Sequence, residues 1–72
     1  MKLYDVYKTP MCRFIQLVAI KDSGLHHFIE VSDNLNRKPI KEERNKSGHV
    51  TRRVNLVYTE EIIASFKKLQ QI

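Results

Sequence analysis

Two apolar-rich runs separated by a short turn constrain the fold of this chain more than any other feature. Residues 13–21 (RFIQLVAIK) are β-branched and apolar on both faces, as in a central strand, and residues 25–32 (LHHFIEVS) predict a second strand. Asp22, Ser23 and Gly24 lie between them, and Gly24 can adopt the positive φ that tight turns often need. The pattern predicts a β-hairpin, around which the rest of the chain must fold.

Further strands are predicted on both sides of this hairpin. Residues 2–8 alternate apolar and polar side chains, and Thr9-Pro10 should end that strand because proline cannot donate to a β-ladder. Residues 50–58 also predict a strand, whose apolar face would consist of Val50, Val54, Leu56 and Tyr58.

The stretch between residues 33 and 49 allows more than one interpretation. Residues 33–38 are rich in Asn and predict a loop. Residues 40–44 could pair with residues 50–54 across a turn at 45–48, or Pro39 could begin one helical turn that runs through Arg44. We favour the hairpin, because residues 50–58 form a strong strand and Glu and Arg side chains would face each other across the pair. Residues 33–49 are therefore expected to form a basic loop or hairpin arm.

The C-terminal residues predict an amphipathic helix. Thr59 is a good N-cap, and Glu60 and Glu61 would occupy the first turn, where the helix dipole favours negative charge. The far end carries Lys67 and Lys68. One apolar stripe would consist of residues at helical spacing, namely Ile62, Ile63, Phe66 and Leu69.

These elements predict one α+β domain spanning residues 1–72, with a small antiparallel sheet of four to five strands and one C-terminal helix packed on it. The strands could curl into an SH3-like barrel or stay in an open sheet, and the sequence does not choose between them. A chain of 72 residues buries a limited core, and its single cysteine, Cys12, excludes an internal disulfide. Homodimerisation is therefore a possible source of extra stability.

The positive charge is concentrated in one segment. The formal net charge is +5, and residues 37–53 alone carry +5, because seven basic residues there face only Glu42 and Glu43. The other residues hold six basic and six acidic side chains, which cancel. Such a segment attracts anions such as phosphate backbones or acidic protein faces. The candidate binding residues are Arg37, Lys38, Lys41, Arg44, Lys46, Arg52 and Arg53.

Other chemistry is poorly supported by the sequence. His26 and His27 are adjacent on a predicted strand, so they point to opposite faces and cannot readily share a metal ion; we expect both to be partly exposed. Cys12 lacks the surroundings of a catalytic thiol signature, and Gly24 and Gly48 are isolated, so no glycine-rich phosphate loop exists. We therefore expect no catalytic residues, no metal, no cofactor and no enzyme activity.

The sequence thus predicts a small basic binding module that contacts DNA or RNA phosphates non-specifically through residues 37–53. The alternative is a compact accessory or inhibitor protein of the kind that phages or mobile elements encode, which would bind an acidic host or defence protein through the same segment. Leu17-Val18-Ala19-Ile20 is the longest apolar run and is too short to span a bilayer, so a cytoplasmic protein without membrane contact is expected.

Overall fold

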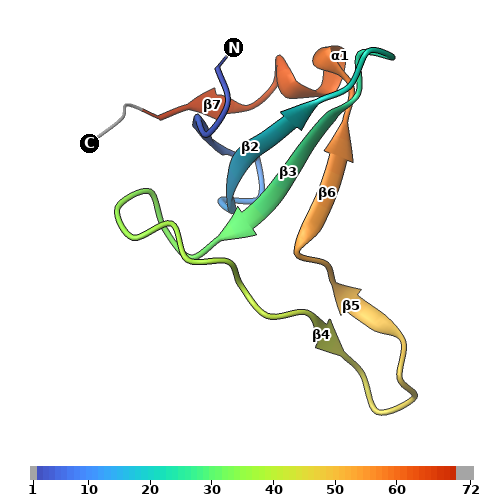
Figure 1. The fold of residues 1–72 in the computed structure, drawn as a ribbon. Coiled ribbons are helices and arrows are strands. Elements are labelled where there is room, and N and C mark those ends of the chain that lie inside the picture. The colour runs from blue at the N-terminus through green and yellow to red at the C-terminus, as the bar shows by residue number, and fades with distance from the viewer. Residues whose placement is uncertain (1, 70–72) are drawn as a thin grey trace.

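The computed structural model describes residues 2–69, and within them five strands form one antiparallel sheet in the order β6-β3-β2-β1-β7 (Figure 1). A second sheet has two strands, β4 and β5. The elements in chain order are β1 (Val6–Lys8), β2 (Phe14–Ile20), β3 (His26–Val31), β4 (Glu43–Arg44), β5 (Val50–Arg52), β6 (Asn55–Tyr58), α1 (Glu60–Ile63) and β7 (Lys67–Lys68). The α+β architecture with a five-stranded antiparallel sheet agrees with the prediction. The sheet is open, with β6 and β7 at its edges, so an SH3-like barrel is not confirmed.

The central hairpin of β2 and β3 is confirmed. The two strands pair from Phe14 opposite Val31 to Ile20 opposite His26, with one β-bulge in β2 between Leu17 and Ala19. The connecting turn has Gly24 at φ +87°, the left-handed conformation that glycine adopts without a steric penalty. The predicted first strand is shorter than expected, because residues 2–5 form a turn and only residues 6–8 are extended.

The outer edge of β3 has two successive partners. Residues 26–29 pair with β6, and the Glu30 N–H donates to the carbonyl of Val54. The carbonyl of Glu30 instead accepts from the N–H of Ile40, and Pro39 forms a β-bridge with Val31. The pairing partner of β3 therefore changes at Glu30. Residues 41–53, which connect the two partner segments, leave the sheet as a separate hairpin.

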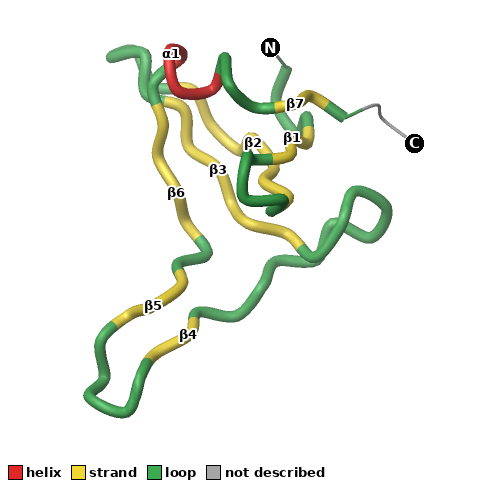
Figure 2. The backbone as a smooth tube through the Cα atoms, turned by 180° about the vertical axis from the view of Figure 1, so that it is seen from behind, coloured by secondary structure: helices red, strands yellow, loops and turns green. Residues whose placement is uncertain are grey.

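This hairpin, which we call the arm (residues 41–53), projects away from the main sheet in both views (Figures 1 and 2). Glu43 lies opposite Arg52 and Arg44 lies opposite Val50, so the predicted pairing of these segments is confirmed. The alternative of a helical turn starting at Pro39 is wrong, because Pro39 forms a β-bridge with Val31 and the Ile40 N–H donates to the Glu30 carbonyl. The predicted strand 50–58 is interrupted, since residues 53 and 54 separate β5 from β6.

The core lies on one face of the main sheet. Its buried residues are Tyr7, Ile15, Leu17, Phe28 and Ile63, and the half-buried Leu56, Tyr58 and Phe66 pack against them. The aromatic rings meet edge to face, with 5.9 Å between the centroids of Tyr7 and Phe28 and 5.0 Å between those of Tyr58 and Phe66. Helix α1 covers this face through Ile63.

The predicted long C-terminal helix is wrong in its extent. Helix α1 has only four residues, and Thr59 makes no side-chain capping hydrogen bond. Lys67 and Lys68 lie in a strand that pairs with Lys8 and Tyr7, and the Leu69 N–H donates to the Val6 carbonyl. Pairing with the free edge of β1 therefore replaces the last helical turns. No helix within the described residues is long and apolar enough to cross a membrane.

Candidate functional site

The structure divides the seven predicted binding residues into two groups. Four have exposed side chains and make no side-chain hydrogen bond or ion pair with any residue between 2 and 69; these are Lys38, Lys41, Lys46 and Arg53. Three of them lie in the arm, and we call Lys41, Lys46 and Arg53 the exposed arm cations. Lys46 is in the turn that joins β4 and β5. Cations that remain hydrated in this way are available to an external anion.

Arg37 belongs to the second group, because its guanidinium is held inside the 33–38 loop. Its Nε donates to the Asn34 carbonyl at 3.0 Å, and its Nη1 reaches the Tyr4 carbonyl at 3.3 Å. Arg37 also has φ +55°, a backbone conformation that non-glycine residues seldom adopt. These contacts tie the loop to the N-terminal turn, so Arg37 has a structural role.

The same loop is organised by the carboxylate of Asp33, which accepts from the backbone N–H groups of Asn36 and Leu35 at 2.6 and 2.9 Å. The Asn36 hydrogen bond is the main reason that the pKa of Asp33 lies below its usual value. An ionised aspartate therefore fixes the loop that carries Arg37 and Lys38.

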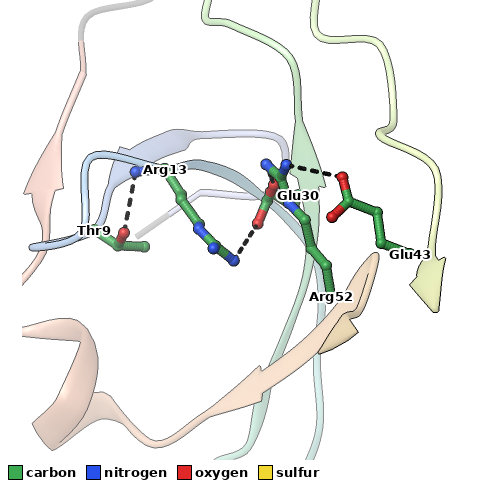
Figure 3. A network of polar contacts seen from close by, with 5 residues as sticks. All are labelled: Thr9, Arg13, Glu30, Glu43 and Arg52. Atoms are coloured by element: carbon green, nitrogen blue, oxygen red, sulfur yellow. Dashed lines mark hydrogen bonds and ion pairs between the residues drawn. The ribbon is translucent and has the colours of Figure 1, made fainter. Parts of the chain in front are cut away.

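Arg52 also has a structural role, in a network at the base of the arm (Figure 3). Its Nη2 donates to Oε2 of Glu30, and its Nη1 lies 3.6 Å from Oε1 of Glu43. Arg13 approaches Glu30 from the other side, with 3.6 Å between its Nη1 and the Glu30 Oε1. Glu30 is 1% exposed, and the hydrogen bond to it raises the pKa of Arg52 above the usual arginine value. The network joins the residue that precedes β2, strand β3 and both strands of the arm.

Arg44 makes local contacts that shape the arm turn. Its Nη1 donates to the Gly48 carbonyl at 2.9 Å, and its Nη2 lies 3.4 Å from Oε2 of Glu42. Asn45 closes the same turn, because its Oδ1 accepts from the N–H groups of Ser47 and His49. The side chain of Arg44 is still 57% exposed, so it can contact a ligand as well.

A pocket opens where the arm meets the main sheet, and the sequence did not predict it. Its volume is about 270 Å³. It is bounded by the turn between β1 and β2, by β5 and by the core face of the sheet, and its lining includes Met11, Arg13, Glu30, Arg53 and Leu56. Arg13 lies outside the basic segment, and Glu30 is a single acidic residue in an apolar strand. The one available signal was strand alternation, which places Arg13 and Glu30 on the same face of the sheet as Ile15 and Phe28.

The histidine prediction is corrected for one residue. His26 is only 3% exposed, and its Nδ1 lies 2.9 Å from the Gly24 carbonyl, whereas His27 is half-buried on the opposite face. Among residues 2–69, no three His, Cys, Asp or Glu side chains are grouped so that they could hold a metal ion. Cys12 is exposed at φ +62° in the turn between β1 and β2.

Comparison with known proteins assigns no class to this arrangement. No protein-family model matches the chain, and neither a curated protein nor a solved structure matches it significantly. The function must therefore be argued from the geometry of the arm and the pocket.

Proposed function

We propose that this chain is a small nucleic-acid-binding module that contacts DNA or RNA phosphates non-specifically through the arm. The observation that carries the proposal is the position of the exposed arm cations on a hairpin that projects from the sheet. Their charges are not neutralised by neighbouring carboxylates within the described residues, so each can replace counterions on a phosphate backbone.

Non-specific binding follows from the chemistry of these groups. Lysine ammonium groups and a lone guanidinium contact phosphates as positive charges, and such contacts position a protein on nucleic acid without reading bases. The arm is short: β4 has two residues and β5 has three. It therefore offers a small, mainly electrostatic contact, whose affinity should fall steeply as salt is added.

The test compares two triple variants with the same loss of charge. The arm variant is Lys41→Ala, Lys46→Ala and Arg53→Ala. The control is Lys2→Ala, Lys21→Ala and Lys67→Ala, because these lysines are also exposed and their side chains make no hydrogen bond or ion pair within residues 2–69. Affinity for single-stranded and duplex DNA is measured by fluorescence anisotropy at several salt concentrations.

The arm variant should bind more weakly, and its slope of log affinity against log salt should be shallower by about 2–3, close to one unit per lost phosphate contact. The control should keep most of the native slope. Equal losses in the two variants would show that overall charge, and not the arm, governs binding. Nuclease-resistant binding to an acidic protein that requires the same three arm cations would favour the accessory-protein alternative.

A further inference from the structure

We infer that the pocket at the base of the arm holds one unpaired nucleobase, so that the module binds single-stranded nucleic acid in preference to duplex. This inference rests on the proposed function and adds a ligand class to it. The arm supplies contacts to the phosphate backbone, and the pocket supplies a contact that requires a base.

The charge of the pocket favours an anionic ligand. Its lining includes the guanidinium groups of Arg13, Arg52 and Arg53, and the only opposing charge in the lining is the carboxylate of Glu30. Glu43 pairs with Arg52 from outside the lining, so the formal charge of the three arginines and the two glutamates is +1. Arg13 and Arg52 are engaged by Glu30, so the exposed Arg53 carries the unpaired positive charge of the lining.

The apolar part of the lining favours a ligand that is more than a phosphate. The half-buried Leu56 and Tyr58 and the exposed Met11 supply this apolar surface, whereas Ile15, also in the lining, is fully buried. A free phosphate would gain nothing from these groups, whereas a nucleobase has a flat apolar face that can pack on them next to its own charged backbone. The volume of about 270 Å³ is just below the range of about 300–1,000 Å³ for small-molecule sites. It suits one planar group.

The pocket is also continuous with the arm. Arg53 is one of the exposed arm cations and lines the pocket, and β5 forms one pocket wall through Val50 and Thr51. A strand whose phosphates contact the arm therefore passes the mouth of the pocket. A base in a duplex is stacked and paired, and extracting it costs a few kcal/mol, so the pocket favours a strand whose bases are already free.

The experiment uses the full chain and three probes that share one backbone length: a single-stranded DNA oligonucleotide, the same strand with all bases replaced by abasic sites, and the duplex of the first strand. All affinities are measured by anisotropy at one salt concentration. The base-containing strand should bind at least about fivefold more tightly than the abasic strand, which is the lower limit for stacking one base. The single strand should also bind more tightly than the duplex per phosphate.

Met11→Glu places a carboxylate at the pocket wall, and Leu35→Glu is its matched control on the 33–38 loop. The two side chains are 75% and 68% exposed, so neither substitution disturbs the core. Met11→Glu should reduce the preference for the base-containing strand to less than about twofold. Leu35→Glu should leave that preference unchanged, although both substitutions add the same charge.

Other outcomes separate this inference from the proposed function. If the abasic and base-containing strands bind equally while the arm variant still loses affinity, the pocket inference is overturned and the arm remains the binding surface. If neither strand binds, both proposals are overturned. If an acidic peptide with an aromatic side chain binds, and Met11→Glu alone weakens it while the two strands bind equally, the pocket serves a protein ligand and the inference fails.

Discussion

Replacing Glu30 with Gln tests whether the buried carboxylate holds the arm on the sheet. Gln has nearly the same shape as Glu, but it carries no charge and has only one acceptor oxygen. In the native protein, each of the two Glu30 oxygens faces a different arginine, Arg13 or Arg52. The amide nitrogen of Gln would face one of these guanidinium groups, so a donor would meet a donor. One arginine must then lose its partner.

The size of the effect follows from burial. Breaking a buried ion pair by removing one partner costs about 3–5 kcal/mol when the remaining charge stays buried. Here the side chains of Arg13 and Arg52 are 42% and 30% exposed, so water can partly hydrate the charge that is left. We therefore expect a loss of about 2–3 kcal/mol, similar to losing a hydrogen bond to a charged group. A domain of this length has a total stability of about 4–11 kcal/mol. The expected shift in Tm is roughly 10–20 °C.

The assay is urea unfolding followed by far-UV circular dichroism, since the chain has no Trp. Glu43→Gln is the matched control, because Glu43 contacts the same arginine and the substitution removes the same charge. Its side chain is 61% exposed, so its ion pair with Arg52 should contribute at most about 1 kcal/mol. If Glu30→Gln lowers the free energy of unfolding no more than Glu43→Gln does, at unchanged m-value, the reasoning from burial is refuted.

Two further predictions separate structure from binding. Arg52→Ala should lower Tm by several degrees, because it leaves Glu30 buried with one weak partner. Arg53→Ala should leave Tm nearly unchanged and reduce the salt slope of DNA binding by about one. Equal Tm values for the two variants would contradict the assigned roles. The pKa of Tyr7 in the folded protein is raised mainly by burial and also by Asp5, so on raising the pH the tyrosine ionises first in the unfolded chain. The contribution of Tyr7 to the free energy of unfolding is therefore fully present below about pH 10 and is lost as the pH rises through the folded pKa. Urea midpoints between about pH 9 and 11 should fall less for Tyr7→Phe than for the exposed-site control Tyr4→Phe, and parallel declines would rule out Tyr7 as the cause.

Local signals explain which parts of the fold could be predicted. The hairpin of β2 and β3 depends on two apolar runs and on Gly24, all within 20 residues, whereas the bulge between Leu17 and Ala19 was not predicted. The arm likewise closes over a short turn between Arg44 and Val50. Both elements were identified because the residues that pair are near one another in the sequence.

The C-terminal segment shows where local signals fail. Ile63, Phe66 and Leu69 recur at helical spacing, and the structure does direct Ile63 and Phe66 to the core. However, the single turn of α1 and the bend that follows it are enough to place Ile63 and Phe66 in the core, so a longer helix is not needed. Helix ends are stabilised only weakly by capping and charge, whereas β1 had a free edge with unpaired backbone groups. Pairing of Lys67 and Lys68 with that edge is a tertiary contact that periodicity cannot reveal.

The buried network limits what a charge count can say about binding. The excess of positive charge in residues 37–53 predicted a binding surface, but Arg37, Arg44 and Arg52 donate hydrogen bonds to other groups of the protein. Arg52 is held by Glu30, which is 22 residues away, and no local pattern marks that glutamate as buried. The same fold adds Arg13, from outside the segment, to the pocket. A phosphate backbone is contacted by cations that no carboxylate of the protein already pairs, so Lys41, Lys46 and Arg53 are better candidates for a binding surface than the whole segment.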